Sequence, residues 1–199
     1  MPRVLICFLP ANSSLLEDHW LNRAAASYAP RPSDGMRPPM VHTELFFPSN
    51  VAAVGGAGVA GAAGDEVFGQ SCGIHFGGKV FLSPKNFSKK EWQFRSYDCS
   101  EVQYDRMYNF CREQVGGSFN RVGYFSPCNP SRWFRKSNTA QQSWYCSELV
   151  AHAMLEGGLL AEKDVSVAGS HPEALYARCL EGSSYADCGR NLTYTKLVL

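Results

Sequence analysis

The feature that most constrains the fold is a polar stretch that runs directly into an apolar helical pattern. Residues 136–143 carry no apolar side chain larger than an alanine, and residues 157–158 are both glycine. Between them, apolar side chains recur three and four residues apart, at Leu149, Val150, Ala153 and Met154. This spacing places them on one face of a helix, and a glycine pair is a common helix end. The sequence therefore predicts a buried helix that begins near Cys146.

The position of Cys146 at the start of this helix has a chemical consequence. Free N–H groups and the helix dipole stabilise a thiolate at a helix N-terminus, which makes the sulfur a better nucleophile. The alternative is a buried structural cysteine, which is the commoner role for this residue type. A histidine close to the sulfur would decide between the two.

Length and charge restrict the class of protein. The chain has 199 residues, with 45% apolar and 19% charged residues and a formal net charge of +1. These values fit one globular domain over residues 1–199 and give no reason to expect nucleic acid as a partner. No apolar run approaches the length of a transmembrane helix, and the apolar segment at residues 4–9 is too short for a signal peptide. We therefore expect a cytoplasmic protein.

The eight cysteines do not follow a metal-binding pattern. No two of them form a C-x-x-C pair, which argues against a structural zinc site and against a thioredoxin-like motif. A chain of this length does not need disulfides for stability, so reduced thiols are expected. No metal or other cofactor is implied.

Strand patterns dominate the first half of the chain. Residues 41–47 form a β-prone run in which His42, Glu44 and Phe46 share one face and Val41, Thr43, Leu45 and Phe47 the other. Residues 51–64 are almost entirely Val, Ala and Gly and predict a mobile loop. A hairpin is expected next, with strands at 71–76 and 79–82 around the turn at 77–78, and a further strand follows at 92–97.

Helices are predicted from capping boxes, in which a serine begins the helix and a Glu or Gln lies three residues later. They place helix starts at Ser14, Ser100 and Ser170. The first helix extends to about residue 28, the second ends at the glycines 116–117, and the third covers 174–180. In the second, an apolar stripe is expected to face the core: Tyr104, Met107, Tyr108, Cys111 and Val115. With a closing strand at 192–199, the pattern predicts an α+β domain with an antiparallel sheet.

A nucleophilic cysteine needs a nearby imidazole and a third polar group that fixes the tautomer of the imidazole. His152 lies about 240° around the helix from Cys146 and points away. His42 is held on a strand of the sheet on which the helix would pack, so it is the best candidate base. Either His75, on a neighbouring strand, or Glu44, on the same face as His42, would orient it.

The segment WYCSELV at residues 144–150 resembles the nucleophile segment of the circularly permuted papain-like hydrolases. These form the YiiX-like and lecithin–retinol-acyltransferase-like branch of the NlpC-type peptidase superfamily, in which the histidine strand precedes the cysteine helix. The order of His42 and Cys146 is the same. The segments GGSFN at 116–120 and HPEAL at 171–175 resemble two further motifs of that branch, in the expected order. The resemblance implies a permuted papain-like fold over about residues 40–180.

The resemblance implies a cysteine-dependent hydrolase of the amidase or peptidase type, which acts on a peptide or an acylated substrate. Two alternatives remain open: a lipid acyltransferase or thioesterase on the same fold, and an inactive binding or structural protein. A disulfide-linked extracellular protein is a further alternative if the thiols are oxidised. The basic and aromatic residues at 132–136 favour ordinary loop packing over contact with a partner or a membrane surface. Oligomeric state is not indicated.

Overall fold

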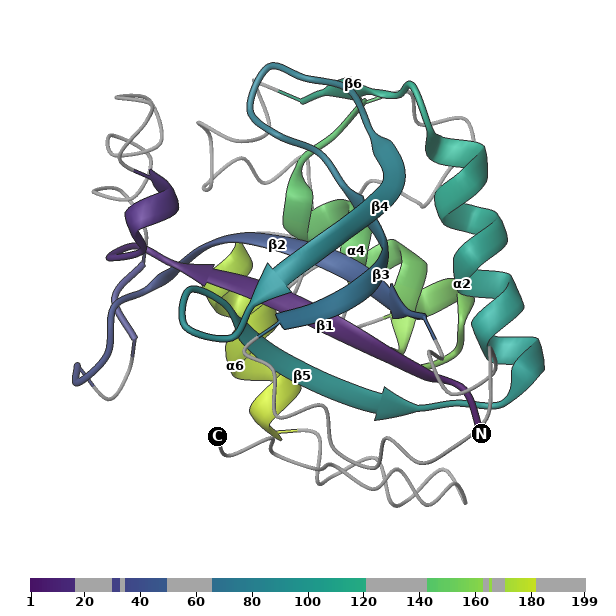
Figure 1. Ribbon diagram of the computed structural model, residues 1–199, viewed down its shortest axis with the longest axis horizontal. Helices are drawn as coiled ribbons and strands as arrows, with labels where there is room; N and C mark the ends of the chain where they lie inside the picture. Colours follow the sequence, from purple (N-terminus) through teal and green to yellow (C-terminus); the bar gives the residue numbers. More distant parts are fainter. Residues whose placement is uncertain are drawn as a thin grey trace.

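The chain folds around one five-stranded antiparallel sheet (Figure 1). The computed structural model describes residues 1–16, 30–32, 35–49, 66–120, 143–162, 165 and 171–181. Within these residues the strands are β1 (Arg3–Pro10), β2 (Met40–Pro48), β3 (Glu66–Gly73), β4 (Phe81–Ser88) and β5 (Gln93–Asp98), in the order β4-β3-β2-β1-β5. The helices are α2 (Glu101–Gln114), α4 (Cys146–Glu156) and α6 (Pro172–Glu181). The prediction of an α+β domain with an antiparallel sheet is confirmed.

One face of the sheet packs against the helices. The core on this side joins side chains of β1, β2 and β3 to the buried faces of α2, α4 and α6. Helix α4 contributes most to it: Leu149, Val150, Ala151, Ala153 and Met154 are all buried. The predicted stripe on α2 is confirmed at Met107 and Cys111, whereas Val115 follows the end of the helix and is 51% exposed.

The opposite face is covered by the sheet itself. Phe87 on β4 contacts Phe46 on β2 with ring centroids 5.0 Å apart, and Phe94 on β5 with centroids 6.2 Å apart. Since β4 and β5 are the two edges of the sheet, these contacts require the sheet to curl until its edges approach. Figure 1 shows β4 drawn across β1 and β2. A second apolar core fills the inside of this curl, which explains why β1 is buried from Val4 to Pro10.

The hairpin of β3 and β4 differs from its prediction in its limits. The structure pairs Gly73 with Phe81 and Glu66 with Ser88, so both strands are longer and the connection spans residues 74–80. His75 was expected on a strand and lies in this connection instead. The prediction that the second strand of the hairpin ends at residue 82 was wrong. Pro84 cannot donate a hydrogen bond to a neighbouring strand, but β4 is an edge strand, where proline is tolerated.

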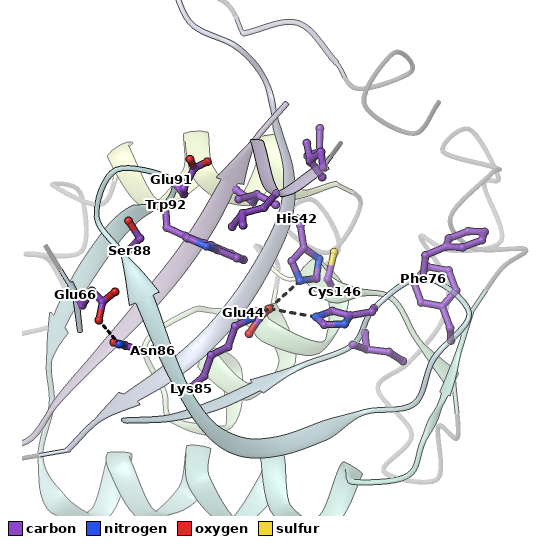
Figure 2. Close-up of a pocket in the computed structure, with 17 residues that line it drawn as sticks. His42, Glu44, Glu66, Phe76, Lys85, Asn86, Ser88, Glu91, Trp92 and Cys146 are labelled. Atoms are coloured by element: carbon purple, nitrogen blue, oxygen red, sulfur yellow. Dashed lines mark hydrogen bonds and ion pairs between the residues drawn. The ribbon is translucent and has the colours of Figure 1, made fainter. Parts of the chain in front are cut away.

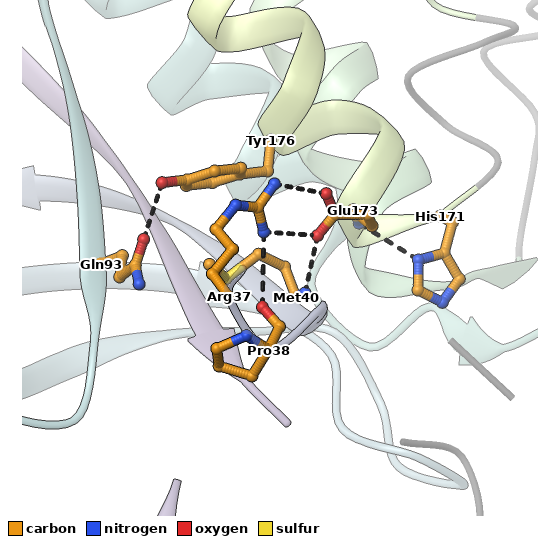
Figure 3. Close-up of polar contacts among 7 residues, drawn as sticks. All are labelled: Arg37, Pro38, Met40, Gln93, His171, Glu173 and Tyr176. Carbon is orange, nitrogen blue, oxygen red and sulfur yellow. Dashed lines mark hydrogen bonds and ion pairs between the residues drawn. The ribbon is translucent and has the colours of Figure 1, made fainter. Parts of the chain in front are cut away.

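Helix α6 is attached to the start of β2 by a buried ion pair (Figure 3). Glu173 accepts two hydrogen bonds from the Arg37 guanidinium, at 2.5 and 2.8 Å, and a third from the backbone N–H of Met40 at 2.9 Å. The Nδ1 atom of His171 accepts the N–H of Glu173 at 3.1 Å and caps the helix. Burial, which the charge of Glu173 only partly offsets, lowers the pKa of His171 to about 4, so the ring is neutral and able to accept. In the predicted capping box Glu173 would reach back to the helix start, whereas here it binds Arg37.

Several expectations concern residues outside the described part of the chain. These are most of the helix after Ser14, of which a short 3-10 turn at Ser14–Leu16 is described, the loop at 51–64, the basic and aromatic residues at 132–136, Ser170 and the closing strand at 192–199. The capping box at Ser100 is confirmed by both of its hydrogen bonds. No described helix combines the length and the hydrophobicity needed to cross a membrane.

Candidate active site

Cys146 is the first residue of α4 and directly follows a short strand and the N-cap residue. The preceding strand β7 (Ser143–Trp144) pairs with β6 (Ser118–Phe119), and the indole of Trp144 donates a hydrogen bond to Gln114 at 3.1 Å. The N-cap residue Tyr145 has an extended backbone and makes no side-chain cap hydrogen bond. The N–H groups of the first turn are therefore not capped by that side chain, and the helix dipole is directed at the sulfur.

Cys146 and the polar residues around it line a cleft of about 640 Å³ (Figure 2). The cleft is lined by the end of β1, the first half of β2, the β3–β4 connection and the start of α4. His42, Glu44 and Lys85 line it together with Cys146 and His75. Residues from four separate segments of the chain are thus brought to one place, which is typical of a functional site.

His42 lies between Cys146 and Glu44. Its Nε2 atom is 3.1 Å from Oε1 of Glu44, and the Cys146 side chain lies next to its ring (Figure 2). Since Nε2 faces the carboxylate, Nδ1 is the nitrogen left for the sulfur. Burial disfavours the charged imidazole, but the negative charges and hydrogen bonds of Cys146 and Glu44 outweigh it and raise the pKa of His42 from 6.5 to about 9. The geometry places an imidazolium beside the sulfur, as nucleophilic catalysis by a thiol requires.

Glu44 is the carboxylate that contacts the His42 ring, and it is 0% exposed. Its Oε2 accepts a hydrogen bond from the Ser71 hydroxyl at 2.6 Å, and its Oε1 faces His42. Burial would raise the pKa of Glu44, but hydrogen bonds from His42 and His75 and the charge of Lys85 hold it well below its usual range. Gly73 leaves room for this side chain, because a Cβ there would lie 2.8 Å from Cγ of Glu44. A buried carboxylate with this many donors is held in one orientation.

His75 approaches Glu44 from the exposed side of the cleft. It is 65% exposed, and its Nε2 lies 3.5 Å from the same Oε1 of Glu44. The rings of His75 and His42 contact each other edge to face, with centroids 5.5 Å apart. Of the two orienting groups left open by the sequence, Glu44 lies within hydrogen-bond distance of His42 Nε2, whereas His75 contacts His42 through its ring and approaches Glu44 through its Nε2.

Lys85 is the residue that sequence reasoning missed. Its ammonium lies 2.6 Å from Oε1 of Glu44 and over the rings of Phe87 and Trp92, 4.7 and 5.0 Å from their centroids. The alternation of Phe81, Lys85 and Phe87 along β4 carried the signal, but the expected strand ended before Lys85. This cation neutralises Glu44 without displacing His42.

The side-chain atoms of His42, Glu44 and His75 also have the spacing of a metal site. Their nitrogen and oxygen atoms lie within 4.8 Å of one another. The carboxylate oxygen that would bind a metal cation is, however, the atom bound by the Lys85 ammonium. A second cation at that oxygen would be repelled, so the donor set fits an ion-pair cluster better than a metal centre.

The other two histidines of the described residues lie outside the cleft. His152 packs on Trp144 with ring centroids 5.2 Å apart, as expected for a residue on the far side of α4. His171 caps α6. No protein-family model matches the chain, and no curated protein and no solved structure matches it either.

The Lys85–Glu44 pair leads to a prediction about pH. A carboxylate whose pKa is lowered by folding stabilises the folded state above its unfolded pKa of about 4.3, and this stabilisation is lost as pH falls towards the folded pKa. Lys85→Met removes a cation that holds this pKa down. We expect the variant to lose about 2 kcal/mol of unfolding free energy at pH 7, and this loss should shrink once pH falls through the folded pKa of Glu44; urea denaturation over a series of acid pH values measures both.

Arg3→Met is the matched control for this measurement. Arg3 makes an exposed ion pair with Asp98 at 2.8 Å, and its loss should cost less than about 1 kcal/mol at pH 7. A loss for Lys85→Met that stayed constant over the whole acid series would contradict the role given to Lys85.

Proposed function

We propose that this chain is a cysteine-dependent acyl hydrolase of the amidase or peptidase type, with Cys146 as nucleophile, His42 as general base and acid, and Glu44 as the residue that orients His42. The observation that carries the proposal is the continuous contact from the Cys146 sulfur through His42 to the buried Glu44, at the edge of an open cleft. Such a chain of contacts is what nucleophilic catalysis by a thiol requires. A structural cysteine has no need of it.

The steps follow from the positions of these groups. The Cys146 thiolate attacks the carbonyl carbon of an amide, ester or thioester, and a first-turn N–H of α4 stabilises the oxyanion. The imidazolium of His42 then donates its proton to the leaving group, which departs from a thioester on Cys146. Neutral His42 next removes a proton from water, which attacks the thioester and releases the acid. Since the pKa of His42 is about 9, turnover should decline as pH rises past that value.

The same features support a permuted papain-like arrangement of the site. The histidine strand β2 precedes the cysteine helix α4 in the chain, and the helix packs on the face of the sheet opposite to the curl. This order agrees with the resemblance carried by residues 144–150 and adds a reason to expect thiol chemistry.

Acylation by an activated ester tests the proposal without knowledge of the substrate. We expect p-nitrophenyl acetate to give a burst of p-nitrophenolate and an acetyl thioester on the peptide that contains Cys146, detected by mass spectrometry. Cys146→Ala should abolish both. Cys99→Ser is the control, because Cys99 is buried beside Pro2, and it should leave both signals intact. Acetylation spread over several residues, with no burst, would refute the proposal and favour a non-catalytic protein.

A further inference from the structure

The cleft continues on both sides of the reacting sulfur, and the two sides differ in composition. Figure 2 shows Trp92 and Glu91 on one side of His42 and Cys146, and Phe76 on the other. The side of Trp92 is bounded by an apolar wall made of Leu9, Leu16, Val41 and Trp92. The ring of Phe76 contacts the ring of Phe119, with centroids 5.0 Å apart.

The apolar wall lies directly beside His42, the proposed catalytic histidine. Leu9 is the register partner of His42 between β1 and β2, and the ring of Trp92 contacts the ring of His42 with centroids 6.0 Å apart. All four residues of the wall belong to the second core, inside the curl of the sheet. A group bound against this wall would therefore lie next to the bond that reacts, on a surface that packing holds rigid.

The charges on this side of the cleft exclude anions. Glu66 and Glu91 form an acidic rim, with Asn86 hydrogen-bonded to Glu66 and with Ser13 and Ser14 hydrogen-bonded to Glu91. The hydrogen bonds from these serines also lower the pKa of Glu91, so this carboxylate is ionised at neutral pH. Among the described residues that line this side of the cleft, Lys85 is the cation, and it is already bound to Glu44. A substrate carboxylate or phosphate would therefore meet the two carboxylates of the rim.

We propose that the substrate carries a bulky, uncharged apolar group next to the reacting bond, of the size of a leucine side chain, and that the apolar wall binds it while the acidic rim rejects anionic groups. This inference rests on the proposed function and gives its substrate class. A long acyl chain fits less well, because beyond the wall the lining becomes polar at Asn86 and Ser88. The expected substrate is therefore an amide with an apolar amino-acid residue beside it, not a lipid.

Thiol-directed probes test this substrate class by the rate at which they label Cys146, with no need for a known substrate. Chloroacetamides react with a thiolate by displacement of chloride, which leaves a thioether on the sulfur. The probes are N-chloroacetyl derivatives of glycine amide, leucine amide and glutamate amide, together with N-decyl chloroacetamide. The measured quantity is the second-order rate of labelling at Cys146, by peptide mass spectrometry, divided by the rate for iodoacetamide on the same preparation.

We expect the leucine probe to label Cys146 about tenfold faster than the glycine probe, as burial of one such side chain allows, and the glutamate probe to be no faster than the glycine probe. Leu15, half exposed at the edge of the cleft, provides a variant that should fold. Leu15→Lys should lower the leucine-to-glutamate ratio about threefold by attracting the carboxylate. Val102→Lys adds the same charge on exposed α2 and should leave the ratio unchanged.

Failure of the substrate class and failure of the proposed nucleophile give different results. Equal rates for the glycine, leucine and glutamate probes would overturn the substrate class and leave the nucleophile intact. A glutamate probe faster than the leucine probe, or a decyl probe faster than all the others, would also overturn it, the latter in favour of a lipid substrate. Failure of iodoacetamide to select Cys146 would instead refute the proposed function.

Discussion

His42→Gln is expected to slow acetylation of Cys146 by p-nitrophenyl acetate at pH 7 by about a hundredfold, the low end for loss of a general base. The ring of His42 is the group that contacts the sulfur, and its positive charge stabilises the thiolate. Without it, the sulfur has neither a cation beside it nor a base that takes its proton. The measurement is the burst rate of p-nitrophenolate between pH 6 and 9, where the variant should approach the wild type only at the alkaline end.

His152→Gln is the control for that variant. It removes an imidazole from the same helix as Cys146, but from the side that packs on Trp144. Its burst rate should stay within about twofold of wild type, as for a substitution outside the site. If His42→Gln had an equally small effect, His42 would not be the base.

Glu44→Gln is expected to have the largest effect on stability, a loss of about 3 kcal/mol of unfolding free energy at pH 7. The carboxylate is buried, and its removal leaves the Lys85 ammonium without the partner 2.6 Å away. It should also lower the pKa of His42, because one of the negative charges that raise it is gone. Urea denaturation measures the first effect, and the pH dependence of the acetylation burst measures the second.

The double variant Glu44→Gln/Lys85→Met distinguishes an unpaired buried charge from a simple loss of packing. Since neither charge remains, the double variant should be more stable than Glu44→Gln alone, by about 1–2 kcal/mol. It should still have the lowered pKa of His42, because the carboxylate is still missing. Additive losses in the double variant would mean that Glu44 and Lys85 do not interact as the structure indicates.

The parts of the site that could be predicted from the sequence depend on local patterns. Cys146 was placed at a helix start because a polar stretch changes to helical spacing there. The period of two along one strand puts Glu44 on the same face as His42, which made Glu44, beside His75, one of two candidate orienting groups. Each inference needed only a few consecutive residues.

The parts that could not be predicted depend on contacts between distant segments. Lys85 approaches Glu44 because the sheet curls and brings β4 over β2, and the curl is set by ring contacts between the two edge strands. Arg37 and Glu173 are 136 residues apart in the chain, so their ion pair has no local signature. His75 lies outside the strand predicted for it because the hairpin connection is longer than the two residues expected. Local propensity contains no information on any of these.

The most direct test is the rate at which iodoacetamide labels each cysteine of the wild-type protein, resolved by site and by pH from 5 to 9. Burial raises the pKa of Cys99 and Cys179 to about 11, and it raises the pKa of Cys7 and Cys111 well above the usual value, so these thiols should stay unreactive. The account predicts that Cys146 is labelled rapidly already at pH 6, and that this labelling is lost in His42→Gln. Labelling of Cys146 that rises only at alkaline pH and is unchanged in His42→Gln would contradict the thiolate–imidazolium pair and, with it, the proposed activity.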